Sequence, residues 1–154
     1  MKAKTLLLFS FIFLLFSCND ATVYSKIDDD FANNRWQKTD AKTYEFAITD
    51  VAPLYNVVLK FSHVYDFQFP QVPIKVQIKD PSGKEENFTF NLKIKDDAGK
   101  ELGDCAGDIC DLKFKMKDKI KLTKGSYIIT ISNAFDKPYL PNVLAVGLNV
   151  EMSK

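Results

Sequence analysis

The sequence is 154 residues long, with 46% hydrophobic residues and 21 basic against 20 acidic side chains. This length suits one domain with one hydrophobic core. A near-neutral chain lacks the basic surface of a nucleic-acid-binding protein, so we expect no nucleic-acid partner.

The N-terminus has the arrangement of a bacterial lipoprotein signal. Lys2 and Lys4 precede the apolar run Leu6–Phe16, and the small residue Ser17 stands directly before Cys18. A basic start, a short apolar run and a small residue before the break are typical of secretory signals. A cysteine directly after the break is the lipobox arrangement. We therefore predict that residues 1–17 are removed and that Cys18 carries a thioether-linked diacylglycerol as the first mature residue.

Two other interpretations compete with this one. The first is a membrane-spanning helix, but eleven residues reach only about half of a ~30 Å hydrocarbon core. The second is an ordinary cleaved signal followed by a chance cysteine. A lipoprotein would be exported and tethered to a membrane by its lipid. Because Asn19 gives no reason for retention in the inner membrane, we expect attachment to the outer membrane, facing either the periplasm or the exterior.

The chain divides into three predicted segments. Residues 1–17 form the signal peptide. Residues 18–34 are polar and include the acidic triplet Asp28–Asp30, which predicts a lipidated N-terminus and spacer with a helical turn near Phe31. Residues 35–154 form the folded domain.

Period-two alternation of apolar and polar residues dominates that domain and predicts half-buried β-strands. It occurs over Tyr44–Ile48, Ile74–Ile78, Phe88–Ile94, Leu112–Met116 and Val146–Met152. Denser apolar runs at Tyr55–Phe61 and Tyr127–Ile131 predict strands buried on both faces. About seven to eight strands separated by turns, without a convincing amphipathic helix, predict an all-β, antiparallel β-sandwich that is immunoglobulin-like or jelly-roll-like.

Cys105 and Cys110 lie close together in a segment rich in aspartate. Outside the cytoplasm a disulfide is the expected state of such a pair, and closing so short a loop would stabilise the fold by about 2 kcal/mol. Zinc is the alternative, but two cysteines without a second pair or nearby histidines supply half a site. The flanking aspartates would bind calcium weakly, since their spacing is not that of an EF-hand loop. We favour the disulfide and predict no metal.

Five lysines occupy every second position between Leu112 and Leu122, and a period of two would place them all on one strand face. They are Lys113, Lys115, Lys117, Lys119 and Lys121. If neighbouring lysine-bearing strands share the sheet, this basic face would suit lipopolysaccharide phosphates, an acidic glycan or an acidic protein. A solvated face whose lysines prevent edge-to-edge aggregation is the alternative that we favour.

An aromatic cluster, Tyr65–Pro70, lies near the end of a predicted strand. Exposed rings at the end of a sandwich would stack on sugars, whereas buried rings would pack beneath a loop. The sequence leaves both open.

The sequence contains no evident catalytic set. His63 is the single histidine, and the adjacent Ser62 would point to the opposite face of a strand. There is no Gly-rich phosphate loop, nucleophile elbow or metal-binding His-Glu motif. We predict that the protein is not an enzyme.

The chain resembles the gliding-motility lipoprotein GldH family of the Bacteroidota over almost the whole mature domain. The matching pieces, in chain order, are Trp36, Phe46-x-Ile48-x-Asp50, Tyr55-Asn-Val-x-Leu59, then His63, Asp66, Phe67 and Phe69, then Gly99-Lys-x-Leu-Gly103, Gly107-Asp-Ile109, Lys124-Gly-x-Tyr127 and Val146-Gly-Leu-x-Val-Glu151. The chain departs from the family at Ser62, where arginine is usual, and at its two internal cysteines.

The resemblance implies a cell-envelope lipoprotein linked to the gliding machinery and, through it, to the type IX secretion apparatus. It brings no enzymatic activity, no cofactor and no catalytic residues. We therefore expect a protein that is attached to the membrane by its lipid and binds other envelope proteins. The alternative, based on the lysine face and the aromatic cluster, is a β-sandwich that binds a glycan or lipopolysaccharide.

Overall fold

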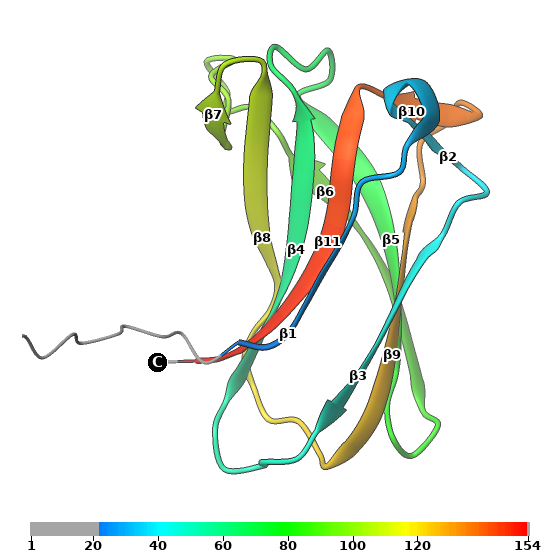
Figure 1. Cartoon of the computed structure of the whole chain (residues 1–154), viewed down its shortest axis with the longest axis vertical. Helices are drawn as coiled ribbons and strands as arrows, with labels where there is room; N and C mark the ends of the chain where they lie inside the picture. Colours follow the sequence, from blue (N-terminus) through cyan, green and yellow to red (C-terminus); the bar gives the residue numbers. More distant parts are fainter. Residues whose placement is uncertain (1–21, 154) are drawn as a thin grey trace, which may run out of the picture.

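The computed structural model describes residues 22–153, which form two packed antiparallel sheets (Figure 1). The predicted signal peptide and Cys18 lie outside the described residues. The strands are β1 (Thr22–Asp28), β2 (Arg35–Gln37), β3 (Lys42–Ile48), β4 (Tyr55–Val64), β5 (Gln71–Lys79), β6 (Glu85–Lys93), β7 (Asp104–Ala106), β8 (Ile109–Ile120), β9 (Gly125–Asn133), β10 (Tyr139–Pro141) and β11 (Val143–Met152). A single 3-10 turn spans Ala32–Asn34, beside Phe31.

The predicted fold class is confirmed. One sheet has the order β1-β11-β4-β8-β7 and the other β3-β9-β5-β6, while β10 and β2 form a small two-stranded ribbon. Each of the seven predicted segments lies in or largely overlaps a strand, namely β3, β4, β5, β6, β8, β9 and β11. Three of the four unpredicted strands have only three residues, which is too short for a period-two pattern.

The fourth unpredicted strand, β1, corrects the predicted spacer. Thr22–Asp28 pairs with β11 along its whole length, so the spacer assigned to residues 18–34 is wrong from Thr22 onward. The polar composition misled because β1 is an edge strand, exposed on one side. Gly147 permits the close pairing, since a Cβ there would lie 2.6 Å from the Lys26 carbonyl oxygen.

The core lies between the two sheets and follows the alternation of the strands. In β3, Tyr44, Phe46 and Ile48 are buried and their neighbours are not. The Tyr44 hydroxyl donates a hydrogen bond to the Val146 carbonyl oxygen of the opposite sheet at 3.0 Å. β4 is buried on both faces through most of its length, as predicted for Tyr55–Phe61. β9 instead alternates between buried and half-buried residues, so the prediction of burial on both faces is wrong there.

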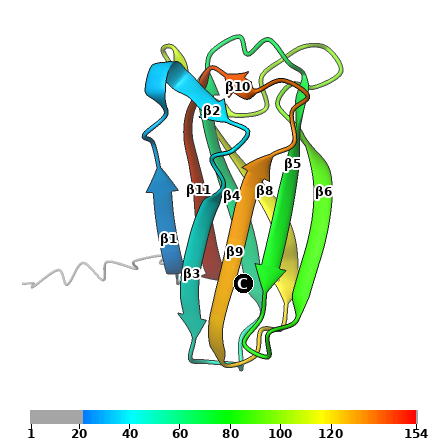
Figure 2. The same cartoon turned by 90° about the vertical axis from the view of Figure 1, so that its right-hand side faces the viewer.

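The strands run between two ends of the sandwich, visible in both views (Figures 1 and 2). We call one the tether end: it holds the start of β1, the end of β11 and the β3–β4, β5–β6 and β8–β9 connections. The other, the loop end, holds the β4–β5, β6–β7, β7–β8 and β9–β11 connections. The two ends differ in what they expose.

Candidate functional site

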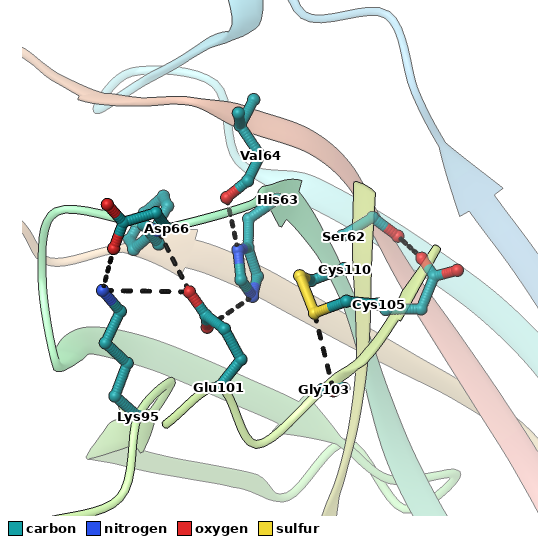
Figure 3. Close-up of a disulfide and its surroundings, with 11 residues drawn as sticks. Ser62, His63, Val64, Asp66, Lys95, Glu101, Gly103, Cys105 and Cys110 are labelled. Atoms are coloured by element: carbon teal, nitrogen blue, oxygen red, sulfur yellow. Dashed lines mark hydrogen bonds and ion pairs between the residues drawn. A yellow bond between two sulfur atoms is a disulfide. The ribbon is translucent and has the colours of Figure 1, made fainter. Parts of the chain in front are cut away.

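A cluster of polar and sulfur-bearing side chains lies at the loop end, where β4, the β6–β7 connection and the β7–β8 hairpin meet (Figure 3). Its members are His63, Asp66, Lys95, Glu101, Cys105 and Cys110. His63 is fully buried. Cys110 lies directly opposite it on β8, so the two side chains share the inner face of the sheet.

His63 has two distinct nitrogens in this cluster. Its Nδ1 lies 2.9 Å from the Val64 carbonyl oxygen. A carbonyl oxygen only accepts, so Nδ1 carries the hydrogen. That Nε2 lies 3.9 Å from Glu101 Oε2. Among the described residues, neither Nε2 nor Oε2 has a hydrogen-bond partner, although both are buried.

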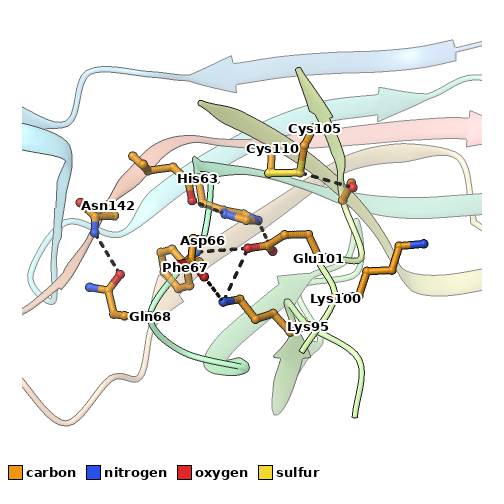
Figure 4. A network of polar contacts seen from close by, with 12 residues as sticks. His63, Asp66, Phe67, Gln68, Lys95, Lys100, Glu101, Cys105, Cys110 and Asn142 are labelled. Carbon is orange, nitrogen blue, oxygen red and sulfur yellow. Dashed lines mark hydrogen bonds and ion pairs between the residues drawn. A yellow bond between two sulfur atoms is a disulfide. The ribbon is translucent and has the colours of Figure 1, made fainter. Parts of the chain in front are cut away.

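The Glu101 carboxylate is held by its other oxygen (Figure 4). Oε1 accepts the backbone N–H of Phe67 at 3.1 Å and lies 3.8 Å from Lys95 Nζ. Lys95 forms a 2.7 Å ion pair with Asp66. The hydrogen bond and charge of Lys95 lower the pKa of the Asp66 carboxyl, and the same pairing raises the pKa of Lys95. The network therefore fixes Glu101 so that Oε2 is directed at His63.

The structure joins Cys105 and Cys110 by a disulfide. Cys110 is buried, whereas Cys105 is exposed and lines a pocket of about 290 Å³ together with Tyr65, Asp66 and Glu101. With both sulfurs bonded to each other, the cluster offers a metal two donor atoms, His63 Nε2 and Glu101 Oε2. In sequence Glu101 is 38 positions from His63, so no local motif identified it.

Ser62 and His63 do not form a nucleophile–base pair. Adjacent in β4, they point to opposite faces, as the strand geometry predicts: Ser62 lies opposite Asp111 and donates its hydroxyl hydrogen to that carboxylate.

The five lysines of the predicted basic face do not share one face. Met116 is an extra residue between the paired positions Lys115–Val58 and Lys117–Val57, and such a bulge reverses the side-chain phase. Lys113 and Lys115 are exposed, opposite Lys60 and Val58. Lys117 instead forms an ion pair with Glu86 of β6 and lies 4.8 Å from the centre of the Phe88 ring.

Beyond the first bulge, a second one displaces Lys119. Its backbone φ is +50° and its N–H donates to the Asn56 side-chain oxygen at 2.9 Å. Lys121 and Lys117 line a groove of about 330 Å³ between the sheets at the tether end. The lysines of β5 and β6 belong to the other sheet, so the single-faced arrangement predicted from spacing is wrong.

The aromatic cluster Tyr65–Pro70 contains both buried and exposed rings, so each of the two predicted arrangements occurs in part. Phe67 is buried against Phe61 and His63. Phe69 contacts Phe135, with ring centres 4.8 Å apart, and both line an open groove of about 550 Å³ with Tyr139 and Pro141. Tyr65 is exposed.

Fold and cluster together define a two-sheet antiparallel β-sandwich with a polar cluster at one end. Within the described residues, no helix has the length and hydrophobicity needed to cross a membrane. The model of the GldH lipoprotein family matches residues 22–150. The chain belongs to this family.

Two curated relatives cover nearly the whole chain. The gliding motility lipoprotein GldH homolog of Christiangramia forsetii is 24% identical over 99% of this chain and 98% of its own length. The gliding motility lipoprotein GldH of Flavobacterium johnsoniae is 26% identical over 90% of this chain and 89% of its own. A solved structure of TmCBM61 with β-1,4-galactotriose has a TM-score of 0.30 and 13% identity, covering 84% of this chain and 81% of that one; so distant a similarity carries no information about function.

Proposed function

We propose that this envelope lipoprotein is anchored in the outer membrane through Cys18 and acts, without catalysis, by binding other envelope proteins of the gliding and type IX secretion machinery. Family membership supports the setting. The observation that carries the mode of action is a set of large apolar side chains exposed at the loop end. Tyr65, Leu102 and Ile109 expose 55%, 47% and 50% of their surface.

The length of the tether orients the domain. Three residues lie between Cys18 and Thr22, so the four Cα–Cα steps from one to the other span at most ~14 Å. The lipid therefore keeps the start of β1 close to the bilayer. Val51 and Leu54, exposed in the β3–β4 connection, lie at the same tether end, where Leu54 accepts a hydrogen bond from the Ser153 N–H. The loop end then faces away from the membrane that holds the anchor.

The exposed residues of the loop end are held on a rigid base. The Tyr65 N–H donates to the Asp108 carbonyl oxygen at 2.9 Å, which fixes Tyr65 next to the β7–β8 hairpin that carries Ile109. Tyrosine is one of the residues that dominate binding between proteins, where surrounding contacts exclude water from it. Protein partners therefore suit this surface better than a small substrate does.

A chromosomal replacement experiment tests this function. Cells carrying Tyr65→Ser together with Ile109→Ser should co-purify at least tenfold less partner protein with the lipidated chain, since interface anchors cost more than ~1.4 kcal/mol. Surface spreading or secretion should fall in parallel. Ile27→Ser is the matched control, because Ile27 is 51% exposed but lies on β1. If cells lacking the gene spread and secrete normally, the proposed role is wrong.

The anchor has its own test. Mass spectrometry of the mature protein should find acyl groups on Cys18 as the first residue, and Cys18→Ser should release the domain from membranes. A mature N-terminus without acyl groups, or one that retains residues 1–17, would contradict the anchor.

The groove beside Phe69 supports a second candidate, binding of a glycan. Phe69, Phe135 and Tyr139 supply aromatic rings on a groove of about 550 Å³, and ring faces suit the apolar faces of sugars. A glycan array probed with the lipidated protein in detergent should then show binding that Phe135→Ala removes. Equal binding by the variant, or no binding at all, would eliminate this candidate.

A further inference from the structure

The fold leaves one buried polar atom of His63 and one of Glu101 without a hydrogen bond among the described residues. With its hydrogen on Nδ1, His63 directs Nε2 at Glu101 Oε2 across 3.9 Å, and neither atom has a hydrogen-bond partner in the part of the chain that the structure describes. Buried polar atoms are almost always satisfied, and an exception calls for an explanation. A cation placed between two acceptors satisfies both.

The surroundings of these two atoms match the outer contacts of a metal site. A histidine that binds metal usually donates its other N–H to a backbone carbonyl or carboxylate, as Nδ1 does toward Val64. A carboxylate ligand is usually held through its second oxygen, as Glu101 is by the Phe67 N–H. These contacts orient Nε2 and Oε2 before any metal arrives (Figure 4).

The sulfur atom of Cys110 lies beside these two side chains. Cys110 Sγ, a ring nitrogen of His63 and a Glu101 oxygen lie within 4.8 Å of one another, and Cys105 lies opposite Cys110 on the neighbouring strand. Ligand atoms bound 2.0–2.3 Å from a tetrahedral zinc ion are about 3.3–3.8 Å apart, so a small contraction brings the set into range. In this structure the sulfurs are bonded to each other, and a disulfide sulfur is a poor ligand because the thiolate is what binds metal.

We infer that reduction of the Cys105–Cys110 disulfide opens a zinc site formed by His63, Glu101, Cys105 and Cys110. The reductant is a dithiol. It delivers two electrons and two protons to the disulfide, becomes a disulfide itself and leaves two protein thiols. Zinc then displaces both thiol protons into solvent. The pocket of about 290 Å³ that Cys105 and Glu101 line gives the dithiol and the ion a route from solvent.

The site would link redox state to the surface proposed for partners. Tyr65 lines the same pocket, and Ile109 lies opposite Ala106 in the hairpin that carries Cys105. Zinc would bridge β4, β8, β7 and the β6–β7 connection through one ion.

Spectroscopic titration tests the site directly. The lipidated protein in detergent is reduced with a phosphine under nitrogen, freed of reductant and titrated with Co²⁺ and then with Zn²⁺. We expect one equivalent of Co²⁺ to give a thiolate-to-cobalt absorption band that Zn²⁺ abolishes, and no band from the oxidised protein. His63→Gln and Glu101→Gln should each weaken binding at least tenfold.

The control variant is Asp108→Asn, which removes an exposed carboxylate of the same hairpin and should bind as the wild type does. Fluorescence of the buried Trp36 reports whether each variant is folded. If His63→Gln fails to fold, Glu101→Gln decides alone, since Glu101 belongs to a connection between strands. A reduced protein that gives no cobalt band, or a folded Glu101→Gln that binds as tightly as wild type, would overturn the inference.

Discussion

At the scale of single residues, Tyr44 shows how one polar atom is accommodated between the sheets. Its ring is fully buried, and its hydroxyl satisfies the Val146 carbonyl oxygen. Burial raises the pKa of the Tyr44 hydroxyl, and the nearby Asp28 carboxylate raises it further. Because the folded-state pKa exceeds the unfolded value of ~10, the contribution of Tyr44 to stability is complete below pH 10. It is lost as the pH rises above that value.

We therefore predict that Tyr44→Phe lowers the free energy of unfolding by about 1 kcal/mol at pH 7, because one buried hydrogen bond is lost. Above pH 10 the wild type should lose stability faster than the variant, so the difference should shrink. Urea unfolding followed by Trp36 fluorescence between pH 7 and 11 measures both effects. Tyr65→Phe is the control, because Tyr65 is exposed. A difference that stays constant over this range would refute the assignment.

At the scale of elements, edge strand β1 depends on one position of its neighbour. Gly147 leaves room for the backbone of Lys26 and Ile27, and an added Cβ would lie 2.6 Å from the Lys26 carbonyl oxygen and 3.2 Å from the Ile27 Cα. Neither backbone group can rotate away as a flexible side chain would. The pairing of β1 with β11 is therefore conditional on glycine at position 147.

Gly147→Ala should lower the free energy of unfolding by about 1–3 kcal/mol, the usual cost of overpacking. The effect should be local, with β1 separating first. Hydrogen exchange measured by mass spectrometry should speed up over Thr22–Asp28 more than over β5. Asn87→Ala, an exposed position on β6, should leave both regions protected. Uniform acceleration in all strands would mean that the glycine serves the whole fold and not β1.

The β7–β8 hairpin contains the disulfide, which joins two cysteines that are five positions apart in the sequence. In the chain-entropy model such a loop stabilises by about 2 kcal/mol. The double substitution Cys105→Ala with Cys110→Ala should reduce the free energy of unfolding by about that amount, measured in urea without metal. The wild type in reductant should match the variant. No difference between oxidised wild type and variant would show that the hairpin is held by its other contacts.

At the scale of the whole molecule, the pairing of the strands joins distant parts of the sequence. β1 pairs with β11 and β4 with β8, so both ends of the described chain meet in one sheet. Chains dominated by such long-range pairs fold slowly, because loops must close before contacts form. The fold also separates the tether end, where β1 begins, from the loop end, which carries the polar cluster.

We expect refolding in milliseconds to seconds, the range of all-β sandwiches. Stopped-flow fluorescence of Trp36, the single tryptophan, reports on folding at the loop end. There the Asn133 side-chain amide donates a hydrogen bond to the Trp36 carbonyl oxygen at 3.1 Å. Far-UV circular dichroism follows both sheets. The two signals should change at one rate for the Cys105→Ala, Cys110→Ala variant, which removes any disulfide reshuffling. Microsecond folding would contradict the expectation.

The amino-acid sequence was enough to assign the all-β class, the positions of seven of the eight longer strands and the family, because alternation and the order of matching residues along the chain can be recognised without tertiary contacts. The strand pairing, the places where bulges in β8 reverse the side-chain direction of the lysines, and the pairing of Thr22–Asp28 with β11 became known only from the three-dimensional structure. It also decided that Glu101 faces His63 beside Cys110. These facts depend on pairing between segments far apart in the chain, and each bulge shifts the side-chain phase by one residue, so no count along a single strand predicts them.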